Sequence, residues 1–114
     1  LEIISVFGVG YDGVPVDSCL VPVCQVDGAT IATVEGLAPA PGSLDALQTA
    51  FLETGGAQCG FCTPGMLMAA RAYLDAGGGQ DEEAIREAIA GNLCRCGTHL
   101  RIVRAVKRAS GQLA

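Results

Sequence analysis

The chain has 114 residues, a formal net charge of −5 and six cysteines, and half of its residues are hydrophobic. This length suits one domain, or one domain with part of a second, because single cores commonly close at roughly 100 to 200 residues. The negative charge argues against a nucleic-acid surface, which needs Lys and Arg to neutralise phosphates. No apolar run approaches the roughly 20 residues of a membrane-spanning helix. We therefore expect a cytoplasmic protein, or a periplasmic one if a leader preceded Leu1.

The N-terminal part is expected to be β-rich. Strand-like stretches cover residues 14–20 and 29–34. Pairs typical of turns separate them, at residues 12–13, 27–28 and 35–36. We assign this β-rich unit to residues 1–37.

A proline-rich stretch at residues 38–42 reads as a linker, because each proline disfavours helical geometry in the residue before it. Beyond it, residues 43–114 predict four helices. The first is expected to be capped by Ser43, to turn Leu44, Leu47 and Phe51 inward and to end at two glycines, 55–56.

The second predicted helix opens at Thr63-Pro64, with the threonine hydroxyl as its cap, and runs to Asp75. It is apolar on nearly all sides, which indicates a core or interface helix. Asp81 is expected to cap a third helix. A fourth should start at Thr98 or His99, with apolar residues facing inward at Leu100, Ile102, Val103, Val106 and Ala109.

The most specific feature is Cys59-x-x-Cys62 combined with Cys94-x-Cys96, two short cysteine loops that each join two predicted helices. Four thiolates on two tight turns can surround a metal centre with sulfur. We predict a 2Fe-2S cluster on these four cysteines. Because such a cluster is negatively charged, backbone N–H groups should point at the sulfurs, and Gly60, Gly65 and Gly97 would let the chain approach closely.

Zinc is the main alternative, since four cysteines also make a closed structural zinc site. A disulfide scaffold is less favoured because such scaffolds belong to small secreted chains. A thioredoxin-like pair would require a βαβ context. Spacing alone leaves iron–sulfur and zinc open.

Other candidate residues are weaker. Cys19 and Cys24 have a C-x4-C spacing, but two thiols cannot hold a cluster, and Cys24 is expected to be a small buried hydrophobe. His99, the one histidine, is expected at the surface at a helix start. No set of residues for substrate chemistry stands out.

From about Val14 to Ser110 the chain resembles the small iron–sulfur subunit of molybdenum hydroxylases, the xanthine dehydrogenase, aldehyde oxidoreductase and carbon monoxide dehydrogenase family. Three stretches carry the resemblance: VDSCLVPVCQVDGATIATVEGL, LQTAFLETGGAQCGFCTPGMLMAA and EEAIREAIAGNLCRCGTHLRIVRAV. It implies an α+β, mostly α fold: a C-terminal four-helix 2Fe-2S domain preceded by a β-grasp, ferredoxin-like domain, here incomplete.

The resemblance also implies function. Cys59, Cys62, Cys94 and Cys96 would bind the cluster nearest the molybdopterin of a large subunit, with Gln58 and Cys96 as neighbours of the pterin. Electrons would pass through it toward FAD on a medium subunit or another acceptor. The apolar second helix and the loop beside the pterin are expected to form the docking face.

The N-terminus departs from the family pattern, because the expected C-x4-C-x2-C run is missing. Ile4 and Phe7 stand at two of its three positions, and Cys19 alone remains of that ligand set. We therefore expect one cluster rather than two and an incomplete β domain, whether through truncation, a frame error or real variation. The alternatives to an electron-transfer subunit are a zinc-stabilised interaction module and a nonfunctional fragment.

Overall fold

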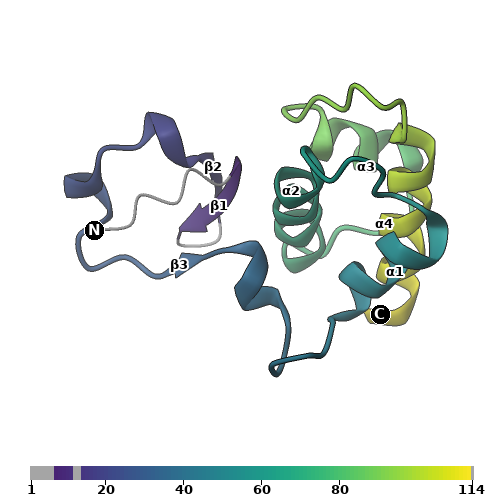
Figure 1. The fold of residues 1–114 in the computed structure, drawn as a ribbon, viewed down its shortest axis with the longest axis horizontal. Helices are drawn as coiled ribbons and strands as arrows, with labels where there is room; N and C mark the ends of the chain where they lie inside the picture. The colour runs from purple at the N-terminus through teal and green to yellow at the C-terminus, as the bar shows by residue number, and fades with distance from the viewer. Residues whose placement is uncertain (1–6, 12–13, 114) are drawn as a thin grey trace.

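The computed structural model describes residues 7–11 and 14–113. In this part of the chain, a small β-sheet lies beside a group of four α-helices (Figure 1). The fold is therefore α+β and mostly α, as the sequence predicted. The predicted turn at 12–13 and the position of Ile4 fall outside the described residues.

Within the described residues, the sheet has three strands in the order β2-β1-β3, and both strand pairings are antiparallel. The strands are β1 (Phe7–Tyr11), β2 (Val14–Asp17) and β3 (Ile31–Ala32). Tyr11 faces Val14 on one side and Ile31 on the other, and the register shifts between Phe7 and Val9.

Both predicted strands are shorter than expected. The first gives way at Ser18–Leu20 to a 3-10 turn, in which the N–H of Val21 donates to the Ser18 carbonyl. The second gives way to a 3-10 turn at Val34–Leu37, where a β-turn was expected. Val34 and Leu37 pack against the helical core, and that tertiary contact replaces a longer strand.

The helices are α1 (Ala46–Thr54), α2 (Thr63–Asp75), α3 (Glu82–Ile89) and α4 (His99–Leu113). Helix α1 packs along α4, and α2 packs against α3 and strand β1. The core is built mainly from small and aliphatic side chains, with Phe51 as its largest fully buried member. None of the helices in the described part of the chain has the length and apolarity to cross a bilayer.

Helix α1 starts with Asp45 as its cap, and the prediction of Ser43 is wrong. The Asp45 carboxylate accepts the Gln48 N–H at 2.7 Å, and the Gln48 side chain accepts the Asp45 N–H at 3.0 Å, forming a capping box. Ser43 instead closes a turn of the linker, donating to the Ala40 carbonyl at 2.7 Å. Leu44 consequently precedes the helix and is exposed, not inward. Gly55 ends the helix in the left-handed conformation, with φ 68°.

Helix α2 is buried in an unbroken run from Gly65 to Ala70. The other helices and strands β1 and β2 cover it, so the prediction that it needs cover on several sides is confirmed. Its predicted share in a docking face is wrong, because the chain's own elements already occupy that surface. Thr63 does not cap the helix either. Cys62 holds the cap position, and the Thr63 hydroxyl lies buried without a hydrogen-bond partner among the described residues.

Helices α3 and α4 begin near the predicted residues. Asp81 caps α3 by accepting the Ala84 N–H at 2.9 Å, and α4 starts at the exposed His99. Ile102 and Val106 are fully buried, but Leu100 is 59% exposed, so its predicted inward position is wrong. Leu100 precedes Ile102 by two residues, about 200° around the helix, and therefore faces away from the core.

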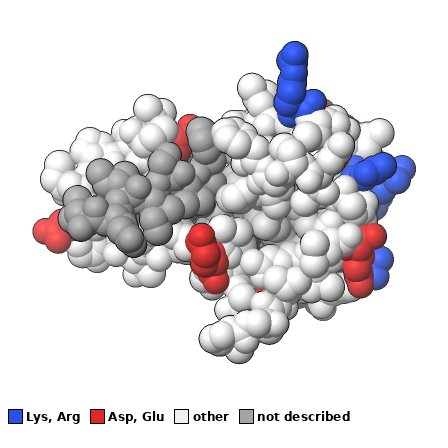
Figure 2. Space-filling model, viewed as in Figure 1, with Lys and Arg blue, Asp and Glu red and all other residues white. Residues whose placement is uncertain are grey.

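Ion pairs attach α4 to its neighbours. Lys107 Nζ lies 3.1 Å from Glu82 Oε1 at the start of α3, and Arg108 Nη2 lies 2.7 Å from Glu53 Oε2 of α1. The elements before the linker (residues 7–11 and 14–37) are called the β part below, and residues 46–113 the helical part. In the face shown in Figure 2, Lys and Arg side chains lie over the helical part and none lies over the β part. All seven basic residues indeed follow residue 70 in the sequence.

Candidate metal centre

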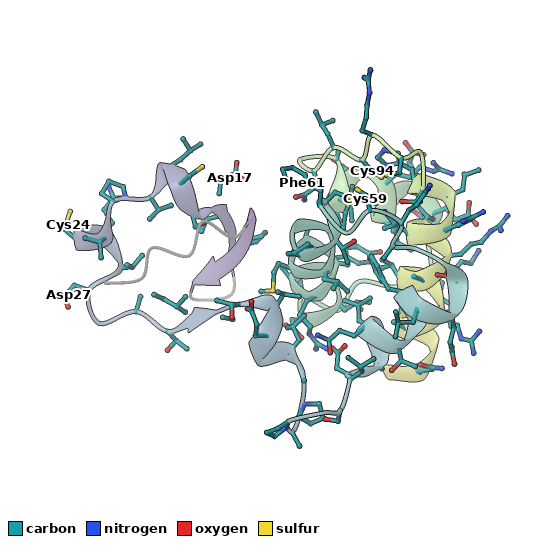
Figure 3. The ribbon with its side chains drawn as sticks, viewed as in Figure 1. Asp17, Cys24, Asp27, Cys59, Phe61 and Cys94 are labelled. Carbon is teal, nitrogen blue, oxygen red and sulfur yellow. The ribbon has the colours of Figure 1, made fainter. Side chains whose placement is uncertain are left out.

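The two cysteine loops lie together at one end of the helical part. Residues 59–62 lead from α1 into α2, and residues 94–96 lead from α3 into α4. Because α1 packs along α4 and α2 against α3, the ends of the helices bring both loops to the same place. Cys59 and Cys94 accordingly lie close to each other, with Phe61 beside them (Figure 3).

The four sulfurs interact as two pairs, each with one cysteine from either loop. The thiol of Cys59 interacts with that of Cys96, and the thiol of Cys62 with that of Cys94. Weaker charge interactions link the pairs, as between Cys59 and Cys94. Within residues 7–11 and 14–113, no three His, Cys, Asp or Glu side chains gather closely enough to hold a single metal ion.

Backbone N–H groups point at the sulfurs, as expected from the sequence. The Phe61 N–H donates to Cys59, and the Cys59 N–H donates to Cys96. Cys94 accepts from the N–H groups of both Cys96 and Thr98. Such donors stabilise negative charge on sulfur without a counter-ion.

Two of the three predicted glycines serve the loop conformation. Gly60 and Gly97 have φ values of 85° and 77°, in the left-handed region that favours glycine. A Cβ atom on either would meet nothing within 4 Å, so backbone conformation, not crowding within the chain, requires glycine here. Gly65 instead lies buried inside α2.

The thiols differ in acidity. The hydroxyl and N–H of Thr98 lower the pKa of Cys94 to about 6, whereas burial raises the pKa of Cys62 to about 11. The Phe61 N–H, followed by the Cys96 thiol, lowers the pKa of Cys59. The site therefore stabilises thiolates at Cys94 and Cys59, the form in which cysteine binds a metal.

Thr98 is a site residue that the sequence analysis did not identify. It is only 4% exposed, and its Oγ1 lies 3.2 Å from Cys94 Sγ. Its carbonyl accepts the N–H groups of Arg101 and Ile102, so it also starts α4. The signal in the sequence was a hydroxyl residue at a predicted helix start, four positions after a predicted ligand.

The remaining candidates lie outside the four-sulfur group. Gln58 is exposed next to Cys59. Cys24 is exposed rather than buried, so that prediction is wrong; its 3-10 turn, Val23–Val26, contains no buried residue. In Figure 3 Cys24 lies at the outer edge of the β part, far from Cys59 and Cys94. Cys19 is also exposed.

The residues present fit an iron–sulfur cluster. They supply four thiols in two pairs together with backbone donors aimed at sulfur. The buried Thr63 hydroxyl, next to Cys62, also lacks an acceptor within the described chain. A buried hydroxyl without a partner is costly, so an acceptor from outside the protein is expected nearby.

Comparison with known proteins also indicates a 2Fe-2S cluster. The model of the 2Fe-2S binding domain family matches residues 33–107. The chain is 44% identical over 99 residues to the nicotinate dehydrogenase small FeS subunit of Eubacterium barkeri, a match that covers 87% of this chain and 62% of the relative. It is 50% identical over 104 residues to caffeine dehydrogenase subunit gamma of a Pseudomonas species, covering 88% and 61%.

Among solved structures, the aldehyde oxidoreductase of Desulfovibrio desulfuricans matches with a TM-score of 0.86 and 38% identity, over 93% of this chain and 12% of that one. The chain thus spans about three fifths of the length of the two curated relatives. The family model, in contrast, covers both cysteine loops and all of helices α1 to α3. The chain belongs to the 2Fe-2S binding domain family.

Proposed function

We propose that the chain carries one 2Fe-2S cluster on Cys59, Cys62, Cys94 and Cys96 and passes electrons for a molybdopterin-dependent hydroxylase or dehydrogenase. The observation that carries this proposal is the meeting of two cysteine pairs, with N–H donors at the sulfurs, at one end of the helices. The bound cluster would accept and release one electron at a time. The chain would supply ligands, hydrogen bonds and burial, and no bond-making residue.

The family match favours two irons over one zinc ion, because the model of the 2Fe-2S binding domain covers both cysteine loops. Each iron of a 2Fe-2S cluster takes two protein ligands, so its four sulfurs fall into two pairs. Here Cys59 pairs with Cys96 and Cys62 with Cys94. We therefore propose that each iron is held by one cysteine from each loop.

The chain purified without oxygen tests the cofactor. We expect about two irons and two acid-labile sulfides for each chain, a brown colour, and a paramagnetic signal after one-electron reduction. Stoichiometric zinc without sulfide would establish the zinc-stabilised module instead. A chain that folds but binds neither an iron–sulfur cluster nor zinc would support the alternative of a nonfunctional fragment.

An apolar surface around the loops suits the docking of a catalytic subunit. Leu93 is 87% exposed, Phe61 75% and Leu100 59%. Phe61 lies within the first cysteine loop, and Leu93 and Leu100 lie on either side of the second. Apolar groups gathered at one site on a small chain mark an interaction surface. We propose that this surface, with Gln58 and Cys96 nearest the pterin, meets a molybdopterin-binding large subunit. FAD on a medium subunit, or another acceptor, would take the electrons onward.

The docking proposal predicts that Phe61→Asp lowers the amount of molybdenum and pterin that co-purifies with the tagged chain by at least tenfold, because a buried unpaired carboxylate is costly. Leu44→Asp is the control, since Leu44 is also an exposed apolar residue but precedes α1, beside the linker. The linker lies at the bottom of the view in Figure 3, whereas Cys59 and Cys94 lie in the upper part of the helical region. Iron and sulfide content should be normal in both variants; equal molybdenum recovery would exclude this docking surface.

We also propose that residues 38–42 separate an N-terminal unit, 1–37, from a four-helix unit, 43–114. The bends and turn of the linker support this division. Contact between the units is still substantial: Gln48 donates to the Val34 carbonyl at 3.1 Å, and β1 packs against α2.

A further inference from the structure

We propose that Thr98 is a positioning residue that raises the reduction potential of the cluster through a hydrogen bond from its hydroxyl to Cys94. This inference rests on the proposed cluster. The contact is direct, since Thr98 Oγ1 lies 3.2 Å from Cys94 Sγ. When Cys94 is a thiolate ligand, it has no proton to give, so the Thr98 hydroxyl is the donor.

The surroundings of Thr98 hold the bond in place. The residue is 4% exposed, so water does not readily replace the hydroxyl as donor. Its carbonyl is fixed by the N–H groups of Arg101 and Ile102, at 2.9 and 3.0 Å, in the first turn of α4. The backbone of Thr98 is therefore anchored at the start of α4, with its hydroxyl within hydrogen-bond distance of the Cys94 sulfur.

The direction of the effect follows from charge. Reduction adds an electron to the cluster and increases the negative charge on the ligand sulfurs. A hydrogen bond to charged sulfur is stronger than one to less charged sulfur, so it stabilises the reduced state more than the oxidised state. Removing the hydroxyl should make the potential more negative.

The test is a redox titration of the reconstituted 114-residue chain, followed by electron paramagnetic resonance. Thr98→Val removes the hydroxyl and keeps the branched shape. We expect its equilibrium constant for reduction to fall about tenfold, which corresponds to about 59 mV for a one-electron couple. Thr98→Ser retains the hydroxyl and should restore the wild-type potential.

Ser110→Ala is the matched control. Ser110 is also a buried hydroxyl residue of α4, but its Oγ donates to the Lys107 carbonyl at 2.8 Å. It lies 12 residues after Thr98, about 18 Å along the helix. This variant tests whether loosening α4 alone moves the potential, and we expect it not to.

The outcomes separate this inference from the proposed function. Wild-type chain without iron and sulfide would overturn the proposed function itself. A loaded Thr98→Val variant with the wild-type potential would overturn only the role of Thr98, as would an equal shift in Ser110→Ala. If Thr98→Val does not load, Thr98→Ala is titrated in its place; if neither loads while Thr98→Ser does, the hydroxyl serves cluster assembly and the proposal is wrong.

Discussion

Replacing either cysteine pair by serine, as Cys59→Ser with Cys62→Ser or as Cys94→Ser with Cys96→Ser, should reduce bound iron and acid-labile sulfide almost to zero. Each double substitution leaves only two of the four thiols, one from each sulfur pair. Two thiolates cannot hold a cluster that needs four. Since both sulfur pairs contain one residue from each loop, either double variant would remove one proposed ligand from each iron. Iron, sulfide and visible absorbance measure the result.

The chain supplies its own control for this experiment. Cys19 and Cys24 also form a closely spaced cysteine pair, but both are exposed and lie in the β part. Replacing both by serine should leave the iron and sulfide content unchanged. A reducible centre that survives in either double variant of the predicted ligands would disprove the ligand assignment.

Phe51→Ala should destabilise the chain by about 3–5 kcal/mol, because truncating a buried aromatic side chain both loses its transfer free energy and leaves a cavity. Phe51 is 2% exposed and belongs to the core shared by α1 and its neighbours. The free energy of unfolding, measured by denaturant titration of the cluster-free chain, gives the size of the loss. Cluster retention should also fall, since α1 leads directly into the first cysteine loop.

Leu52→Ala is the matched control, because the neighbouring leucine is 66% exposed on the same helix. Both substitutions replace a large apolar residue with alanine, which favours helix, so intrinsic propensity does not explain a difference between them. We expect less than about 0.5 kcal/mol for Leu52→Ala. Equal losses in the two variants would mean that the packing around Phe51 contributes nothing particular to stability.

Local signals in the sequence were enough to find the helices. Asp81 caps α3, Pro64 lies in the first turn of α2 and Gly55 ends α1, as expected from capping oxygens, proline geometry and left-handed glycine. These features act within one turn of the chain, so their position in the sequence is sufficient. The error at Ser43 arose because Asp45, two residues later, also offers a capping oxygen and has Gln48 to complete the box.

Features that depend on contacts between distant segments could not be predicted from the sequence. The strand expected at 29–34 shortens because Val34 and Leu37 pack on the helical core instead. The expected docking role of α2 fails for a related reason: its apolar residues predict cover, but not whether that cover comes from this chain or from a partner. In this fold strands β1 and β2 provide part of it.

The sequence by itself determined which four sulfurs are available and that helices present them, because cysteine spacing and helix caps are local properties. Only the tertiary structure decided how the sulfurs pair, which amides and hydroxyl point at them and which apolar residues remain exposed around the loops. The physical reason is that the packing of α1 along α4 and of α2 against α3 joins loops distant in sequence, and hydrogen bonds to sulfur depend on that placement.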